Sequence, residues 1–444
     1  MRSLETLTAL LLALALPALG AAQESVRAEP PPLFQSDMTR MTGQTAEDPM
    51  AGMAMPGWSF MTMGVARLVY NHQGGLSGDE TVESSNWVMA MGQHGLGRGR
   101  LTLMLMNSLE PATFHRGGSP ELFQVGETFE GRPLVDHQHP HDFFMNLSAT
   151  YRLPVGERAA VWLQAAPRGE PALGPTTFMH RASAGENPTA ILSHHFQDST
   201  HITDDVVTVG AGYGRFTLEG SAFHGQEPDE GRWDLDPGGL DSWSGRLKVR
   251  LGGGWSGQVS HGKLHEPEAL NPGDVKRTTA SLHYGAEGAG PLAVSLVWGR
   301  NRESHGTFKG YLLEGAWQAT SVDHFYARGE QADRDLDLLV FKGGVPVPRP
   351  QPQREAGAAA SLLDRRIAVR ALTLGYLRDL HRFAAPSWLG PVHVGVGADL
   401  TLYQSESLLD ATYGEAPLSV HAFLRVRWGT PHGTHGGHAM PGGH

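Results

Sequence analysis

The chain contains 444 residues, of which 57 are glycine, 23 are histidine and none is cysteine, and its formal net charge at pH 7 is −11. The lack of cysteine excludes disulfides, iron–sulfur clusters and zinc sites built from thiolates. The acidic balance argues against nucleic-acid binding, which needs a basic surface. A mean hydropathy of −0.28 and a single apolar run exclude a polytopic helical membrane protein.

That apolar run lies at the N-terminus, over 7–18, after Arg2 and before the small residues of 20–22. A run of this length behind a positive start is typical of a secretory signal peptide and is too short for a membrane anchor. We therefore expect an exported protein. The predicted organisation is a signal peptide over 1–22, a methionine-rich mobile periplasmic segment over 23–57, a barrel over 58–428 and a histidine-rich tail over 429–444.

Segments of about ten residues with alternating faces dominate the chain. In 100–108, for example, Leu101, Leu103 and Leu105 face one way, while Met104 and Met106 face the other. The same period of two recurs over 143–151, 243–251, 366–378, 392–403 and 420–428. This alternation predicts strands rather than helices.

The connections between these strands alternate in length. The tight, glycine-rich ones are 95–99, 154–158, 214–215, 252–254 and 287–291, and the long ones are 110–142, 168–205, 225–241, 265–274 and 332–354. In an exported chain this rhythm predicts an all-β fold, a single antiparallel transmembrane β-barrel with short periplasmic turns and long extracellular loops. A periplasmic sandwich or propeller is the soluble alternative, but the repeat of about 40–50 residues that propellers carry is missing.

The number of strands follows from a parity argument. Seventeen candidate strands can be drawn between Trp58 and Trp428, whereas single-chain bacterial barrels have even numbers. The weakest candidates are 354–363, which is mostly alanine, and 405–414. We predict about 16 strands, with 14 or 18 as the alternatives.

If the apolar strand faces meet lipid, the polar faces line the lumen. The lumen-lining residues predicted in this way are Arg246, Lys248, Arg250, Arg366, Arg370, Arg378, Asp399, Arg425 and Arg427. Rings of charge at a constriction set solute selectivity. The alternative is that these groups pair with one another across a plugged interior.

Histidines gather in two of the long loops. They are His137, His139 and His141 in the first loop, and His180, His194, His195 and His201 in the second. Imidazole with a nearby carboxylate is a common combination in transition-metal sites. Hydrogen bonding within loops that fold inward is the alternative, because long loops without a strand or helix pattern commonly constrict or plug a domain.

A second set of possible metal ligands lies at the two ends of the chain. Its residues are Met50, Met53 and Met55 before the barrel, and His432, His435, His438, Met440 and His444 after it. Thioethers select Cu(I), and imidazoles bind Cu(II), Ni(II) or Zn(II). The ends therefore predict binding of copper or another transition-metal ion, with a merely solvated tail as the alternative.

Enzyme signatures are poor: no Gly-x-Ser-x-Gly elbow, His-Glu-x-x-His motif or phosphate loop occurs. Ser193 with His194, or Ser199 with His201, would be the serine and base of an outer-membrane hydrolase. Such pairs are common, so we expect no enzyme and keep the hydrolase as an alternative.

Several loop segments resemble a family of uncharacterised bacterial outer-membrane β-barrel proteins. They include Glu170-Pro-Ala-Leu-Gly-Pro-Thr-Thr-Phe-Met-His-Arg181 and Trp298-Gly-Arg-Asn301. The other matching segments are 113–118, 120–128, 134–144, 194–203 and 225–230. The resemblance implies a porin-like barrel and an association with envelope metal-efflux systems, and it assigns no functional residue.

Together these observations predict a porin-like channel or binding barrel of the Gram-negative outer membrane, linked to copper or metal handling. Its expected partners are outer-membrane lipid and periplasmic metal-handling proteins, and no nucleic acid. The sequence specifies no oligomeric state. The alternatives are a general diffusion porin without a metal role and an outer-membrane hydrolase.

Overall fold

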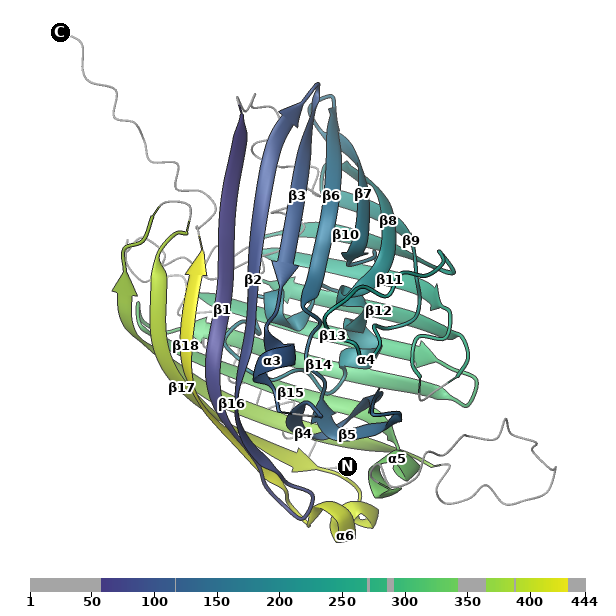
Figure 1. The fold of residues 1–444 in the computed structure, drawn as a ribbon, viewed down its shortest axis with the longest axis vertical. Coiled ribbons are helices and arrows are strands. Elements are labelled where there is room, and N and C mark those ends of the chain that lie inside the picture. The colour runs from purple at the N-terminus through teal and green to yellow at the C-terminus, as the bar shows by residue number, and fades with distance from the viewer. Residues whose placement is uncertain are drawn as a thin grey trace. The chain divides into compact units, whose positions relative to one another are not determined.

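The computed structural model describes residues 57–115, 117–269, 272–285, 291–341, 365–386 and 389–429. Sixteen antiparallel strands close into one barrel (Figure 1), as the sequence predicts. They are β1 (Trp58–Gln73), β2 (Glu80–Leu96), β3 (Gly99–Asn107), β6 (Phe144–Val155), β7 (Ala159–Gly169), β8 (Thr203–Tyr213), β9 (Phe216–Phe223), β10 (Ser242–Gly252), β11 (Trp255–Leu264), β12 (Val275–Tyr284), β13 (Leu292–Arg302), β14 (Thr307–Gln318), β15 (Asp323–Asp335), β16 (Arg366–Phe383), β17 (Val392–Gln404) and β18 (Leu418–Gly429).

The barrel closes where its first and last strands meet. β1 pairs with β18 in a register that places Gly64 opposite Trp428, and β1 also pairs with β2 on its other side. Gly64 is required there, because a Cβ on this residue would lie 2.4 Å from the Trp428 ring. Closure leaves no unpaired sheet edge, which is what a sheet in lipid needs.

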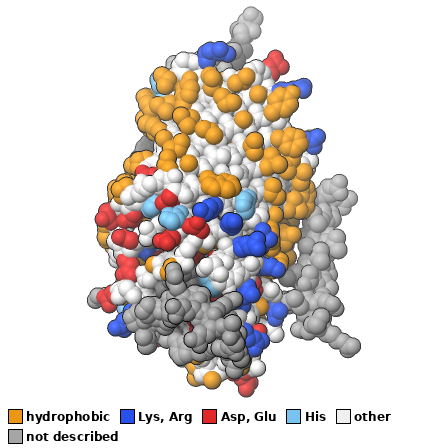
Figure 2. Space-filling view, turned by 90° about the vertical axis from the view of Figure 1, so that its right-hand side faces the viewer, with side chains coloured by type: hydrophobic (Ala, Val, Ile, Leu, Met, Phe, Trp, Pro, Cys, Tyr) orange, Lys and Arg blue, Asp and Glu red, His pale blue; other side chains and the backbone are white. Residues whose placement is uncertain are grey.

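The exterior of the barrel is apolar. On β3, Leu103 and Leu105 are exposed, while Thr102, Met104 and Met106 between and beside them are buried on the inside. Figure 2 shows hydrophobic side chains over the upper part of one face, with charged side chains gathered lower down. In the described residues, no helix combines the length and apolarity needed to cross a bilayer. The fold is that of an outer-membrane β-barrel.

One strand has its faces reversed relative to the prediction. On β16 the buried side chains are Ile367, Val369 and Ala371, and the predicted lumen residues Arg366, Arg370 and Arg378 lie on the outer face, where Arg378 pairs with Asp323 at 2.7 Å. The inner face of β16 is apolar because it packs against Leu122 and Phe123 inside the barrel. The assignment of these three arginines to the lumen was therefore wrong.

The long connections leave the barrel at one end and fold into it. In the chain, β3 and β6 are connected through a hairpin of β4 (Ser119–Phe129) and β5 (Arg132–Gln138), which forms a separate two-stranded sheet. The short helices are α3 (Glu110–Thr113), η1 (Phe178–His180), α4 (His194–Gln197), η2 (Ser199–His201), α5 (Leu336–Phe341), η4 (Ser407–Leu409) and α6 (Asp410–Tyr413). The weak strand candidate 405–414 is thus largely helical, and the candidate 354–363 lies outside the described residues.

Candidate functional site

The connection between β7 and β8, residues 170–202, forms an inner loop that crosses the lumen. Most of its side chains are buried, and α4 contacts β12, β13 and β14. Gly299 and Gly310 give it room, because a Cβ on either would lie within 2.4 Å of loop atoms. Wall residues that bond to the loop are Arg67 (β1), Ser221 (β9), Arg246 (β10), Ser260 (β11), Arg277 (β12), Asn301 (β13), Glu314 (β14), Arg328 (β15) and Arg425 (β18).

Most of the predicted lumen-lining charges contact either the inner loop or other residues of the barrel wall. Arg246 donates to Glu219 at 2.9 Å and to the carbonyl of Gly174 at 3.0 Å. The remaining contacts are Lys248 with Glu219, Arg250 with the carbonyl of Gly214, Asp399 with His421 and Tyr326, and Arg425 and Arg427 with Glu186. Of the two interpretations of these charges, pairing across a plugged interior agrees with the structure.

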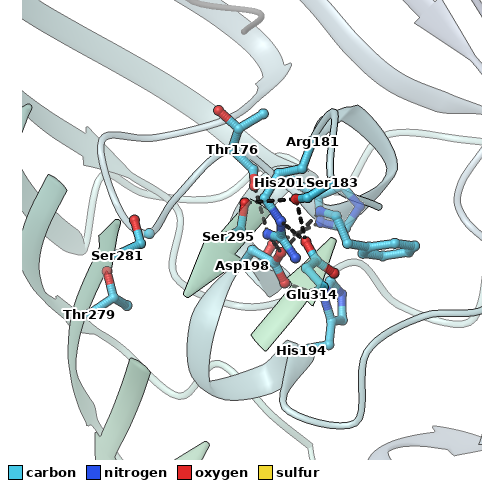
Figure 3. A network of polar contacts seen from close by, with 12 residues as sticks. Thr176, Arg181, Ser183, His194, Asp198, His201, Thr279, Ser281, Ser295 and Glu314 are labelled. Atoms are coloured by element: carbon cyan, nitrogen blue, oxygen red, sulfur yellow. Dashed lines mark hydrogen bonds and ion pairs between the residues drawn. The ribbon is translucent and has the colours of Figure 1, made fainter. Parts of the chain in front are cut away.

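A buried carboxylate organises the centre of the inner loop (Figure 3). Asp198 accepts from Arg181 Nη1 at 2.7 Å, from the backbone of Phe178 at 3.0 Å, and from His194 Nδ1 at 2.8 Å. Arg181 in turn donates to Glu314 of β14 at 2.7 Å. The pKa of Asp198 is held well below its usual range: burial alone would raise it, but Arg181 and His194 outweigh burial. Asp198 is therefore a fixed anion.

Three of the predicted histidines lie beside it, with their rings in T-shaped contact. The ring centroids of His201 are 5.2 Å from those of His194 and 5.4 Å from those of His141. In each ring Nδ1 is held, in His141 by Glu110 at 2.7 Å, in His194 by Asp198, and in His201 by the carbonyl of Asp198 at 3.0 Å. Such bonds direct Nε2 outward, as in histidines prepared for a metal.

Burial keeps two of these loop histidines neutral. It lowers the pKa of His180 to about 3, and it lowers the pKa of His201 well below the usual value. His180 packs against Trp87 of β2, with ring centroids 4.7 Å apart. Neutral imidazole is the form that binds a metal ion.

A compact set of three possible metal ligands lies next to this cluster. His195 of α4 places Nδ1 3.7 Å from Glu227 Oε1 and 3.6 Å from Glu268 Oε1, and one ligand atom from each residue lies within 4.8 Å of the others. These separations exceed hydrogen-bond length. They match those of donors around one ion, because ligands at about 2.1 Å in tetrahedral or wider geometry stand roughly 3.4–3.6 Å apart.

Two polar atoms of this trio, one on His195 and one on Glu227, are not satisfied by the protein. His195 Nδ1 and Glu227 Oε1 are buried, and neither has a hydrogen-bond partner in the described chain. Burial alone would lower the pKa of His195, but Glu227 and Glu268 outweigh it and raise the pKa to about 10. The raised pKa means that His195 carries a proton between the two carboxylates. The same carboxylates would attract a metal cation.

The lack of a side chain at Gly126 leaves room for the ring of His195. A Cβ on Gly126 of β4 would lie 2.6 Å from Cε1 and Nε2 of the His195 ring. Asn301 of β13 also anchors this residue, donating to the His195 carbonyl at 3.0 Å. Hairpin, inner loop and barrel wall therefore fix the imidazole together.

The other predicted site residues are scattered. His137 lies 3.8 Å from the exposed Asp79, and His139 pairs with Glu127, whereas His141 is held by Glu110. The predicted ligands Met50, Met53, Met55, His432, His435, His438, Met440 and His444 lie outside the described residues.

Of the two serines considered for a hydrolase, Ser199 is engaged by the barrel wall, whereas Ser193 Oγ is buried without a hydrogen-bond partner among the described residues. Ser199 Oγ accepts from Arg277 Nη1 at 2.8 Å. Ser193 packs against β14, where a Cβ on Gly310 would lie 2.4 Å from Ser193 Cβ.

Sequence reasoning missed Glu227 and Glu268. They belong to the loops before β10 and before β12, which meet the inner loop only in the folded barrel. It also missed a signal within three strands, namely Met-x-Met at Met61, Met89 and Met104.

Known structures share the barrel. The anion-selective porin from Comamonas acidovorans is similar with a TM-score of 0.51 and 11% identity, over 84% of this chain and 100% of that one. OprB of Pseudomonas putida, in its high-pH structure, gives 0.46 and 12% over 84% and 94%. A loop-deletion mutant of OmpT from Vibrio cholerae gives 0.47 and 9% over 83% and 99%. No protein-family model and no curated protein sequence matches the chain.

The likeness to the Comamonas porin shows the fold alone. The outer-membrane barrel expected from the sequence is thereby confirmed, whereas the association with metal efflux stays a prediction. Function has to be argued from the side chains.

Proposed function

We propose that this protein is a plugged outer-membrane barrel that binds a divalent transition-metal ion in its lumen, at His195, Glu227 and Glu268. The observation that carries the proposal is the spacing of this trio, whose atoms are too far apart for hydrogen bonds and correctly spaced to share an ion. Burial adds to it, since His195 and Glu268 are buried and Glu227 is partly buried, and buried charges are stabilised by pairing or by a metal.

The donor set indicates the class of ion. One imidazole and two carboxylates suit Zn(II), Cu(II) or Ni(II). Arg277 lies close enough to lower the pKa of Glu227 together with His195. With a neutral imidazole, the two carboxylates and this guanidinium leave a net negative charge. A divalent ion therefore exceeds this charge by one. Three protein ligands leave a further coordination position, which allows an ion to enter and leave by ligand exchange.

The arrangement of the inner loop supports binding over free diffusion. A general diffusion porin needs a continuous aqueous lumen, whereas the loop bonds to β1, to β18 and to each strand from β9 to β15. A solute that crosses this barrel has to pass side chains that contact it, and the imidazoles and carboxylates beside the loop are ligands for metal ions.

Metal titration of the refolded, full-length barrel tests the proposal. We expect the wild type to bind one more equivalent of Zn(II) than the His195→Gln variant, by calorimetry after removal of bound metal. His137→Gln is the matched control, since His137 also neighbours a carboxylate but lies outside the trio. Equal stoichiometry and affinity in the wild type and His195→Gln would refute the site.

A further inference from the structure

Six methionines form a regular array on the inner wall of the barrel. Met61 and Met63 lie on β1, Met89 and Met91 on β2, and Met104 and Met106 on β3. In the register of these strands Met61 faces Met91, which faces Met104, and Met63 faces Met89, which faces Met106. The result is two adjacent rows of three methionines.

The array belongs to one cluster of side chains. Met145 of β6 and Met179 of the inner loop join the six, so that eight of the 15 methionines of the chain gather here. Directly opposed residues in antiparallel strands have Cβ atoms about 4.5–5.5 Å apart, which lets flexible thioethers on neighbouring strands converge on one point. Five of the six array residues are buried, and Met61 is partly buried.

Core packing alone does not account for the choice of residue. The outward positions of β3 carry Leu101, Leu103 and Leu105, so leucine serves where only apolar bulk is needed. On the inside, two successive inward positions of each of β1, β2 and β3 carry methionine instead. Methionine is the less specific packing residue because of its flexibility, and an unbroken array of it points to the chemistry of the thioether.

The surroundings suit a soft ion of low charge. The hydrophobic members of the cluster include Trp87, Val65 and Ile202, and the His180 ring packs against Trp87 with ring centroids 4.7 Å apart. Thioethers are uncharged, so they give a divalent ion none of the charge compensation that a buried charge needs. A monovalent ion loses less, and both thioether sulfur and the face of Trp87 favour a polarisable cation.

We propose that this methionine array is a binding site for a soft monovalent cation, Cu(I) or its analogue Ag(I), on the lumenal wall. The array lies three to seven residues from the strand ends at Trp58, Leu96 and Gly99. These strand ends lie at the end of the barrel with the tight turns, which is the periplasmic end. This site is separate from the trio at His195 and goes beyond the divalent site proposed there, so either can exist without the other.

Silver titration of the refolded, full-length barrel tests the array. The variant is Met89→Leu, Met91→Leu, Met104→Leu, Met106→Leu, since leucine and methionine exchange with little loss of volume. We expect Ag(I) affinity to fall at least tenfold, or one equivalent to be lost. X-ray absorption of the Cu(I)-loaded wild type should show sulfur ligands that this variant lacks. Heat-modifiable migration on gels confirms that the variant barrel has folded.

Two controls separate the array from other sites. Met50→Leu, Met53→Leu, Met55→Leu removes three of the thioethers upstream of β1 and should keep the array equivalent. His195→Gln should also keep it. The proposal is overturned if the wild type binds no Ag(I), if the strand variant binds as the wild type does, or if the upstream variant alone abolishes binding.

Discussion

Arg427 of β18 donates to Glu186 of the inner loop at 2.9 Å, and the neighbouring Arg425 contacts the other carboxylate oxygen of the same residue. Arg425 has no exposed surface, and both Glu186 and Arg427 are buried. One carboxylate thus ties the middle of the loop to the last strand of the barrel. Because the loop carries His194, His195 and His201, this tie also helps to position the metal-ligand candidates.

Glu186→Gln should loosen the inner loop strongly. It removes the Glu186 charge from two buried guanidinium groups, of which Arg425 keeps its contact with Asp379, and breaking one buried pair typically costs about 3–5 kcal/mol. The free energy of unfolding in urea, measured in lipid vesicles, should fall by about that amount. Glu157→Gln in the exposed turn before β7 is the control and should change little. An unchanged free energy in Glu186→Gln would mean that the tie is not needed.

The tie should also resist acid. Burial alone would raise the pKa of Glu186, but Arg425 and Arg427 outweigh it and hold the pKa well below its usual range. For a carboxyl with a depressed folded pKa, the stabilisation is present above the unfolded pKa and is lost only as pH falls through the folded value. Mild acid at pH 5 should therefore leave this contact intact.

Part of the acid sensitivity of the folded loop should instead come from His180. Its pKa is lowered by burial from 6.5 to about 3, so the unfolded chain binds a proton that the folded chain does not. Stability is then complete above pH 6.5 and declines as pH falls from 6.5 towards 3, by up to about 1.4 kcal/mol for each pH unit. Thermal midpoints between pH 7 and pH 4 measure this decline, which should be smaller in His180→Gln. Equal slopes in both proteins would exclude His180 as the cause.

Gly126→Ala should damage the divalent site without disturbing the barrel. The added Cβ would meet the His195 ring at 2.6 Å and displace it from Glu227 and Glu268. We expect Zn(II) affinity to fall about tenfold or more, which corresponds to about 1.4 kcal/mol. Gly131→Ala in the same hairpin is the control, since it too has a positive φ but meets nothing within 4 Å. Similar losses in both variants would point to the hairpin backbone instead.

Bound metal should stabilise the protein against heat. An ion that binds only the folded state adds about 2.7 kcal/mol at a free concentration of 100 times its Kd. Zn(II) should therefore raise the unfolding midpoint, and a chelator should reverse the change. The gain should be absent in Glu227→Gln, Glu268→Gln. A gain that persists in this double variant would place the stabilising ion elsewhere.

The strands could be predicted from the sequence, but not always the face that points inward. On β3 the leucines face out as expected, because that strand follows the simple rule of an apolar exterior. On β16 the rule failed, because Phe123 of the hairpin joins Ile367 and Val369 in one buried cluster inside the barrel, which makes the inner face of this part of β16 apolar as well. Period-two alternation separates two faces and does not say which of them meets lipid.

The site was predictable in part. The sequence singled out His195 from the density of histidines in its loop, and it could not supply Glu227 and Glu268, whose loops approach only through barrel closure. The methionine array differs in this respect. Its spacing of two in three successive strands can be read from the sequence, and only the register of Met63, Met89 and Met106 requires the fold.

Binding of a divalent metal ion by His195 inside the barrel can be tested by spectroscopy. The most direct test is electron paramagnetic resonance of the refolded protein loaded with one equivalent of Cu(II), in a background of His432→Gln, His435→Gln, His438→Gln, His444→Gln. We predict nitrogen coupling from an imidazole ligand, lost on adding His195→Gln and retained on adding His137→Gln. A spectrum that His195→Gln leaves unchanged would contradict the account.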